Sequence, residues 1–364
     1  MRFPEFSGEW NKYTINDLAT VVGGGTPDTT VKSYWGGDIQ WFTPSEIGKN
    51  KYVDFSKRTI TRDGLDNSSA KLLPLHTILL SSRATVGECS IASNECTTNQ
   101  GFQSLIAKQC NIDFLYYLIQ TKKKDLIRNA CGSTFLEISA NEIRKIKVAV
   151  PVQNEQEQIA KLLSLIDERI ATQNKIIEKL QSLIKGLRVC CMQRVYGNNV
   201  YLSEIAQIYQ PQTISSTELT EDGFLVYGAN GIIGKYKDYN HETEQICITC
   251  RGNTCGMVNY TKPMSWITGN AMVINTDKYQ DKVCKRYLYH YLSAYNFNSI
   301  ISGSGQPQIV RTPLEKLKIT LPTISEQKQK AIIFDKIQDK IDINHKVLNL
   351  YIGQKQYLLR QMFI

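Results

Sequence analysis

Two long stretches of the chain carry apolar side chains at alternating spacings of three and four residues. In the first stretch these positions are Ile159, Leu163, Ile166, Ile170, Gln173, Ile177, Leu180, Ile184 and Leu187. In the second they are Phe334, Ile337, Ile341, Asn344, Leu348, Tyr351 and Leu358, with one break at Lys355. Heptad spacing keeps one apolar stripe on one side of a helix. The pattern therefore predicts two long helices, over 154–190 and 325–361, that pack against partner helices.

One polar residue interrupts each apolar stripe, Gln173 in the first and Asn344 in the second. A polar residue at such a position costs stability and can fix the register of two helices. If the two helices pack antiparallel, we expect Gln173 and Asn344 to face each other and to set that register. The alternative is that each is simply a tolerated polar position.

The starts of the two helices also resemble each other. Pro151 and Pro322 precede the stripes, at positions where a missing backbone N–H costs little. Asn154 and Ser325 are the expected N-caps.

The two helices belong to a longer internal repeat. A shift of 171 residues places Pro151 on Pro322, Glu155 on Glu326 and Gln156 on Gln327. Residues 132–170 and 303–341 share about a dozen identities. The segments before them repeat the same frame, although their middles resemble each other much less. A duplicated frame with different inserts suggests one task performed on two different targets.

Short apolar runs and turn residues predict a mixed globular unit before each helix. In the first unit we expect strands near 38–42, 77–81, 88–92, 103–107 and 147–150, and helices near 16–19, 66–71, 113–128 and 139–144. The segment 97–101 is expected to connect two strands. In the second unit the corresponding strands are 245–249 and 318–321, and the helix is 287–293.

Composition narrows the class of protein. Hydrophobic residues make up 42% of the 364 residues and charged residues 21%, which predicts a folded chain of two or three structural units. The net charge of +9 fits an acidic partner such as DNA, although many basic proteins bind none. The opening MRFPEFSGEW lacks the apolar core of a signal peptide, and no apolar run is long enough to cross a membrane. Ten cysteines in such a chain are expected to be reduced cytoplasmic thiols.

Several short motifs occur in a fixed order along the chain. They are RFPEFSGEW, LATVVGGGTP, IQWFTPSEI, SSRATVG, TNQGF, the pair IKVAVPVQNEQEQIAKLLSLIDERI and LKITLPTISEQKQKAIIFDKI, and the tail LLRQMF. Together with the duplication and the spacing, they resemble the specificity subunits of type I restriction–modification systems. The resemblance covers nearly the whole chain.

The resemblance implies an α+β fold with two pseudo-repeated target-recognition domains separated by two long antiparallel coiled-coil helices. The boundaries are then 1–150 for the first domain, 151–195 for the central helix, 196–322 for the second domain and 323–364 for the C-terminal helix. Each domain is expected to read one half of a split DNA sequence. A helix over 159–187 is roughly 40 Å long, about one turn of DNA, so helix length is expected to set the unread gap.

The resemblance also implies partners and an absence of catalysis in this chain. The expected partners are double-stranded DNA, two copies of an N6-adenine methyltransferase (modification) subunit, and a motor–nuclease (restriction) subunit. S-adenosylmethionine, ATP and magnesium are expected on those subunits and no cofactor on this chain. Two alternatives stay open: a specificity subunit of a type IIB-like or methylation-only system, and a coiled-coil adaptor that binds no DNA.

The sequence itself carries no catalytic or metal motif that we recognise. The methyltransferase motif [DNS]PP[YFW] is absent. The stretch 228–235 resembles a phosphate-binding loop, but its spacing is one residue too long, and Tyr236 stands where Ser or Thr is needed. Cys247 and Cys250 form a single C-x-x-C on a predicted strand, where residues three apart face opposite sides. The four histidines fit no triad or metal motif.

The candidate DNA contacts lie in turns and polar loops that occur in both halves. Arg83 and Arg251 follow apolar strands, and arginine can clamp phosphate or read guanine; the alternative is a surface arginine paired with a carboxylate. Amide side chains can read adenine edges, and glycine-rich loops can approach the DNA backbone, although both are also common in ordinary turns. The full candidate set is Arg83, Thr98, Asn99, Gln100, Ser133, Thr134, Arg251, Asn253, Thr268, Asn270, Ser304 and Gln306.

Overall fold

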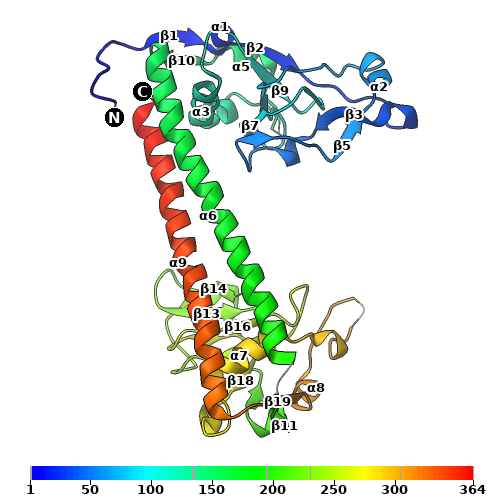
Figure 1. The fold of residues 1–364 in the computed structure, drawn as a ribbon, viewed down its shortest axis with the longest axis vertical. Coiled ribbons are helices and arrows are strands. Elements are labelled where there is room, and N and C mark those ends of the chain that lie inside the picture. Colours follow the sequence, from blue (N-terminus) through cyan, green and yellow to red (C-terminus); the bar gives the residue numbers. More distant parts are fainter. Residues whose placement is uncertain (1, 133–135, 194–195, 230, 304, 364) are drawn as a thin grey trace. The chain divides into compact units, whose positions relative to one another are not determined.

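A computed structural model describes residues 2–132, 136–193, 196–229, 231–303 and 305–363 (Figure 1). The chain divides into two compact units. Unit 1 is Met1–Asn174 with Val347–Ile364, and unit 2 is Lys175–Lys346. Two long helices, α6 (Gln153–Gln193) and α9 (Ile324–Met362), each contribute one segment to each unit. The helix segments are therefore part of the folded units, whereas the sequence predicts separate helical segments over 151–195 and 323–364.

Unit 1 contains a five-stranded sheet, a three-stranded sheet and a strand pair. The larger sheet has the order β2 (Ala19–Gly23), β9 (Gln103–Ala107), β6 (Ile78–Leu80), β7 (Cys89–Ala92) and β4 (Tyr52–Val53). The smaller sheet has the order β5 (Arg58–Ile60), β3 (Trp35–Phe42) and β8 (Cys96–Thr98), and the pair is β1 (Asn11–Thr14) with β10 (Lys147–Val150). The helices are α1 (Ile15–Leu18), α2 (Arg62–Asp66), α3 (Ile112–Thr121), α4 (Lys123–Arg128) and α5 (Ala140–Lys145).

Unit 2 has nearly the same topology. Its larger sheet has the order β12 (Gln207–Tyr209), β18 (Ala271–Asn275), β15 (Ile246–Thr249) and β16 (Val258–Tyr260). Its smaller sheet has the order β14 (Gly231–Tyr236), β13 (Phe224–Gly228) and β17 (Trp266–Ile267), and its pair is β11 (Asn198–Tyr201) with β19 (Lys318–Leu321). The helices are α7 (Lys285–Ala294) and α8 (Arg311–Glu315).

The middles of the two units, which differ in sequence, share their strand pairing. In unit 1, β3 pairs antiparallel with β5 and parallel with β8. In unit 2, β13 pairs antiparallel with β14 and parallel with β17. The duplication therefore extends through the whole of each unit, and the α+β class predicted from the sequence is confirmed.

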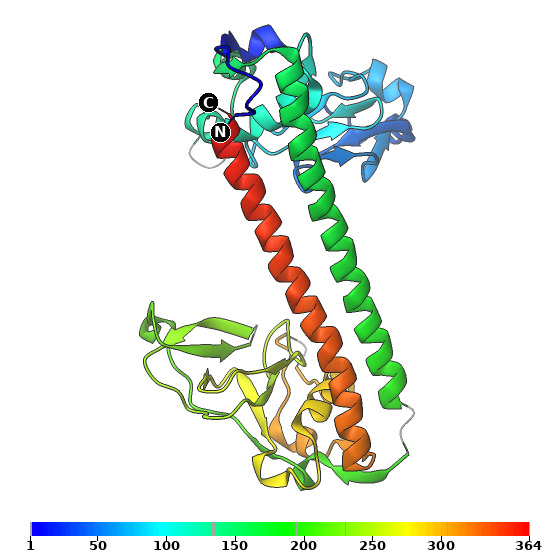
Figure 2. The same ribbon diagram turned by 60° about the vertical axis from the view of Figure 1, so that its left-hand side comes forward.

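The long helices bury the predicted stripes inside the units. In unit 1, Ile159 and Leu163 of α6 share a core with Leu358 and Met362 of α9. In unit 2, Ile184 of α6 shares a core with Phe334 and Ile341 of α9. Within each unit the two segments run in opposite directions (Figure 2).

The two polar interruptions of the stripes are nearly buried. Gln173 is 8% exposed and Asn344 is 9% exposed. The Asn344 amide also donates a hydrogen bond to the Lys340 carbonyl within α9. Because Gln173 belongs to unit 1 and Asn344 to unit 2, the prediction that they face each other stays a prediction.

Three local predictions are wrong. The helix expected at 66–71 lies earlier, at α2, because Thr61 accepts a hydrogen bond from Gly64 N and caps that segment. The helix expected over 113–128 is divided into α3 and α4. Thr97 and Thr98 are in β8 rather than in a connection between strands.

The predicted N-caps are wrong too. Asn154 and Ser325 lie inside the first turns of α6 and α9. Thr323 caps α9 instead: its hydroxyl accepts from Glu326 N, and its own N–H donates to the Glu326 carboxylate.

Candidate nucleic-acid interface

The structure joins two groups of candidates that the sequence left apart. In unit 1 the turn at Arg83 lies against the end of the polar loop that begins at Gly132. Ala84 N donates to Leu136 O at 3.1 Å, and Ile138 N donates to Ser82 O at 2.9 Å. These bonds hold the arginine turn and the polar loop together as one surface.

Unit 2 repeats this junction bond for bond. Gly252 N donates to Pro307 O at 3.0 Å, and Ile309 N donates to Cys250 O at 3.0 Å. The polar loops are closed in the same way, by paired backbone bonds between Cys131 and Glu137 in unit 1 and between Ser302 and Gln308 in unit 2. We call the two surfaces turn–loop junctions; their described residues are 82–84 with 131–132 and 136–138, and 250–252 with 302–303 and 305–309.

The two junctions differ in one charge. In unit 1 the Arg83 guanidinium forms an ion pair with Glu137, with Nε and Oε2 3.2 Å apart. In unit 2 the position of Glu137 is taken by Gln308, which has no charge. Arg251 is exposed and forms no ion pair with any residue that the structure describes. Its guanidinium is therefore available to an anionic partner, whereas that of Arg83 is shared with a carboxylate.

Two candidates prove to be interior residues, which corrects the expectation for them. Thr98 and Thr268 are each 1% exposed, and neither hydroxyl has a hydrogen-bond partner among the described residues. Both follow or end a strand that pairs in parallel with the middle strand of the smaller sheet, so their side chains point into the fold. Both hydroxyls are buried beneath the surface in this structure.

Most of the other candidates lie at the surface. Asn99 is half-buried, and its side-chain oxygen accepts a hydrogen bond from Gly101 N at 2.9 Å. Gln100 is exposed and accepts from the Thr26 hydroxyl at 2.5 Å. In unit 2, three candidates are exposed: Asn253, Asn270 and Gln306.

Both junctions connect to this amide surface through the backbone. Ser82 N donates to Gly101 O at 2.8 Å in unit 1, and Cys250 N donates to Asn270 O at 3.1 Å in unit 2. Three further candidates, Ser133, Thr134 and Ser304, lie outside the residues that the structure describes.

Known proteins share this duplication of the chain. The family model described as "Type I restriction modification DNA specificity domain" matches residues 7–182 and 198–350. The chain belongs to this family. The two matched segments, which we call specificity domains, each contain one turn–loop junction.

Relatives with curated names support the same assignment. The chain is 39% identical over 183 residues to the type I restriction enzyme MjaIX specificity subunit of Methanocaldococcus jannaschii, covering 47% of this chain and 42% of that relative. It is 26% identical over 355 residues to the EcoprrI specificity subunit of Escherichia coli, covering 90% and 87%. The crystal structure of a type I S subunit from M. genitalium has the same fold, with a TM-score of 0.64 and 18% identity over 100% of this chain and 99% of that one.

A repeated glutamine contact of the specificity domains is not predicted by the sequence, because its role is visible only in three dimensions. The Gln156 amide donates to Pro151 O at 2.9 Å, while its oxygen accepts from Asn111 N at 3.0 Å. Gln327 does the same with Pro322 O at 2.9 Å and Cys284 N at 2.8 Å. In both units this glutamine ties the strand-to-helix corner to the start of α3 or α7. Its equal spacing from proline in both repeats was the available signal.

The glutamate before this glutamine has a different partner in each specificity domain. Glu326 of unit 2 accepts hydrogen bonds from Thr323. Glu155 is fully buried and accepts from the Arg2 guanidinium and from Trp10 Nε1. The Trp10 ring also contacts Phe363 edge-on, with ring centres 6.3 Å apart. The opening and closing motifs of the chain are thus packed together in unit 1. They are parts of its core rather than candidates for contact with DNA.

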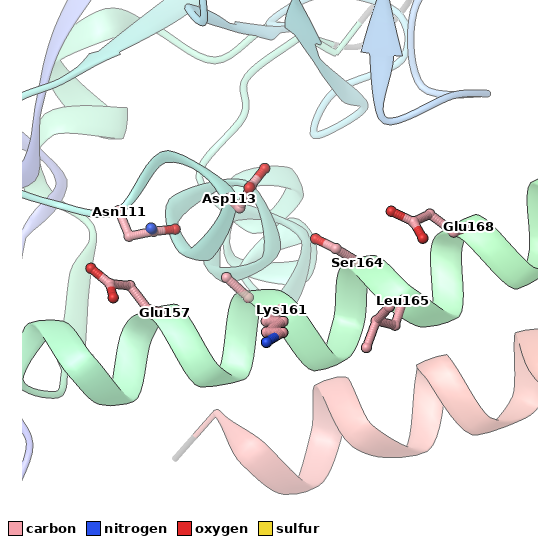
Figure 3. Close-up of a pocket in the computed structure, with 8 residues that line it drawn as sticks. Asn111, Asp113, Glu157, Lys161, Ser164, Leu165 and Glu168 are labelled. Atoms are coloured by element: carbon pink, nitrogen blue, oxygen red, sulfur yellow. The ribbon is translucent and has the colours of Figure 1, made fainter.

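A pocket of about 380 Å³ lies on unit 1 between the start of α3 and α6 (Figure 3). Three carboxylates line it, Asp113, Glu157 and Glu168, against the single cation Lys161. Since an excess of carboxylates repels phosphate, this side of the specificity domain is a poor surface for DNA.

The two cysteines of the C-x-x-C face different cores, as predicted for residues three apart on a strand. Cys247 packs in one buried cluster and Cys250 in another. Burial raises the pKa of the Cys247 thiol to about 12, which disfavours the thiolate that a metal would need. Among the described residues, no group of three or more His, Cys, Asp or Glu side chains is arranged to hold a metal ion. No helix within that part of the chain has the length and apolar character needed to span a membrane.

Proposed function

We propose that this chain is the DNA-recognising specificity subunit of a type I restriction–modification complex, and that each unit reads one half of a split target sequence. The observation that carries the proposal is the duplication of the turn–loop junction. Two specificity domains with nearly the same strand order hold the same backbone junction, yet present different side chains on it. A repeated frame with different surface residues suits two half-sites of different sequence.

The chemistry of the junctions suits a nucleic acid. Arginine beside exposed amides can combine contacts to phosphate with readout of base edges. Arg251 with Asn253 and Asn270 supplies this combination in unit 2, and Arg83 with the exposed Gln100 and the half-buried Asn99 supplies it in unit 1. The net charge of +9 over the whole chain favours association with DNA.

The partners follow from the proposed role. We expect two modification subunits to carry S-adenosylmethionine and methylate adenine at N6, and a restriction subunit to use ATP and magnesium. This chain then positions the methyltransferase, which takes the target adenine out of the duplex. All ten cysteines are free thiols, as suits a reducing compartment, and we place the complex in the cytoplasm.

The deciding experiment is methylome sequencing of cells that carry this chain with its modification subunit, with and without the chain. The expected result is a split N6-methyladenine motif that disappears when the chain is deleted. In the same cells, exchange of residues 196–322 for those of a relative should change one half of the motif and leave the other half intact. An unchanged methylome would contradict the proposal.

Binding at different salt concentrations separates a DNA reader from an adaptor. The assembled complex should lose affinity for duplex DNA steeply between about 50 and 200 mM salt, because phosphate contacts release counterions. An adaptor that joins other proteins would retain no DNA at any salt concentration. Cleavage of unmodified DNA distinguishes a restricting complex from one that only methylates.

A further inference from the structure

A short segment of unit 1 presents an aromatic side chain to solvent. Phe55 lies in the connection between β4 and β5 and is 82% exposed. Leaving a phenyl ring in water is unfavourable, and single exposed apolar residues are common and need no function. Phe55 differs from these in how its backbone is held and in which residues flank it.

The backbone around Phe55 is fixed by hydrogen bonds on its C-terminal side. Ser56 N donates to Gln40 Oε1 at 2.7 Å, and Trp41 N donates to the Ser56 hydroxyl at 2.9 Å. Lys57 N donates to Glu46 Oε1 at 2.6 Å. The segment is therefore ordered before any ligand arrives, which reduces the entropy lost when Phe55 binds one.

Two cations lie two and three residues after Phe55. Lys57 and Arg58 are exposed, and neither forms an ion pair with any residue in the described part of the chain. The Arg58 guanidinium lies over the Trp35 ring, 3.5 Å from its centre, which fixes its position without neutralising it. Asp54 is the one carboxylate in the segment, so 54–58 carries two positive charges against one negative charge.

The segment is also continuous with the candidate DNA surface of unit 1. Glu46, which accepts from Lys57, belongs to the short 3₁₀ helix Pro44–Glu46. Pro44 in turn packs against Gly101, where an added Cβ would lie 3.0 Å from the proline ring. Gly101 bonds to Asn99 and to Ser82 of the turn–loop junction.

We propose that Phe55 inserts at a base step of the duplex while Lys57 and Arg58 contact the phosphates beside it. Apolar wedges of this kind partly unstack a base step and kink the DNA. This inference rests on the proposed function, and it adds a contact in the first specificity domain that makes recognition depend on how easily one step unstacks. Lys57, which has no ion-pair partner among the described residues, suits a phosphate better than a protein interface, because lysine is depleted at the centres of such interfaces.

The test uses the complete complex of this chain with its modification subunits and a duplex that contains the methylated motif. 2-Aminopurine is placed in turn at each adenine of the site, because its fluorescence rises when stacking is lost. The variants are F55A, F55W and K57Q, and the control is Y196A, which removes an aromatic ring that is 97% exposed in unit 2. A thermal melt of each variant verifies folding.

We expect F55A to weaken binding on the order of tenfold, as for loss of one base–aromatic contact. The dependence of affinity on salt should stay unchanged in F55A, since no charge is lost, and should fall by about 0.9 in slope in K57Q. F55W should retain affinity. At one position of the site, the rise in 2-aminopurine fluorescence seen with the wild-type complex should be lost with F55A and kept with Y196A. At adenines that the methyltransferase flips out, the fluorescence should stay high with both variants.

Three outcomes overturn the proposal in distinguishable ways. If the wild-type complex binds the site and F55A binds equally well, the wedge is wrong and the proposed function stands. If F55A loses modification subunits while the complexes that still form bind DNA normally, the segment is a protein interface. If the wild-type complex itself binds no DNA, the proposed function fails together with the wedge.

Discussion

The side-chain amide of Gln156 donates a hydrogen bond to the carbonyl oxygen of Pro151 at 2.9 Å, and Gln327 makes the same bond to Pro322. The oxygen of each amide accepts a hydrogen bond from the backbone N–H at the start of the preceding domain helix, at Asn111 before α3 or at Cys284 before α7. Each glutamine therefore connects three elements: the last strand of its unit, the long helix that follows this strand, and the domain helix α3 or α7.

Replacing Gln156 by Leu should destabilise unit 1 by about 2 kcal/mol. The substitution removes the partner of the buried Pro151 carbonyl and of the partly buried Asn111 N–H, and each unsatisfied buried group costs about 1–3 kcal/mol. Urea unfolding measures the loss. Gln153→Leu, on the exposed face of the same turn, is the control and should change stability by less than about 0.5 kcal/mol. Equal effects of the two substitutions would contradict this role for Gln156.

The charge difference between the two turn–loop junctions predicts opposite effects of two reciprocal substitutions. Glu137→Gln should release Arg83 and raise DNA affinity, whereas Gln308→Glu should give Arg251 a carboxylate partner and lower it. Each change alters the local charge by one, so the slope of log affinity against log salt should shift by up to about 0.9 in the corresponding direction. Titrations at four salt concentrations measure both slopes. A shift in the same direction for both variants would argue against contact of these arginines with phosphate.

The residue after each arginine has a positive φ, so substitutions there should change stability through the backbone conformation alone. Ala84 has φ = 62° and Gly252, at the equivalent position, has φ = 85°. Gly252→Ala should cost about 1 kcal/mol, because an alanine there adopts the left-handed region and its Cβ meets no atom within 4 Å. Ala84→Gly should be neutral or slightly stabilising, since relief of strain opposes the greater freedom of glycine in the unfolded chain. Thermal melts of the two variants verify the signs.

A buried charged cluster in unit 2 predicts a loss of stability in acid. The His290 side chain is fully buried, with Nε2 2.7 Å from Asp335 Oδ1 and Nδ1 2.9 Å from an Arg188 nitrogen. Arg286 also donates to Asp335. In this arrangement Nε2 donates and Nδ1 accepts, so the imidazole is neutral, and burial lowers its pKa.

The direction of the pH effect follows from that lowered pKa. Below about pH 6.5 the unfolded imidazole takes up a proton that the folded one does not, so stability falls as pH falls, by at most about 1.4 kcal/mol per pH unit. Burial raises the pKa of Asp335, but hydrogen bonds from His290 and Arg286 outweigh it and leave that pKa lowered. Asp335 therefore adds a second loss as pH falls below about 4.

His290→Gln removes the titration at this site. The variant should be less stable than the parent at pH 8 but should show a smaller decline between pH 6.5 and 5, as measured by urea unfolding at each pH. His345→Gln, at an exposed position on α9, is the matched control and should retain the decline of the parent. A decline that is unchanged in His290→Gln would assign the effect to other groups.

The elements that were predicted correctly are those whose signal is local. The stripes from Ile159 to Leu187 and from Phe334 to Leu358 repeat over many turns, so they indicate helices whatever surrounds them. Strands such as β9 and β10 are short apolar runs between turn residues. The equal spacing of Pro151 and Pro322 from their glutamines revealed the duplication.

Tertiary contacts decided the candidate site. Arg83 and Glu137 are far apart in the chain, and only the fold brings the turn to the polar loop. Thr98 and Thr268 resemble exposed loop residues in the sequence, yet the parallel pairing of β8 and β17 buries them. Phe55 became a candidate only when its exposure and fixed backbone were visible. Helical periodicity depends on residues that are close together in the sequence. Burial and the pairing of short strands depend on contacts with distant parts of the chain.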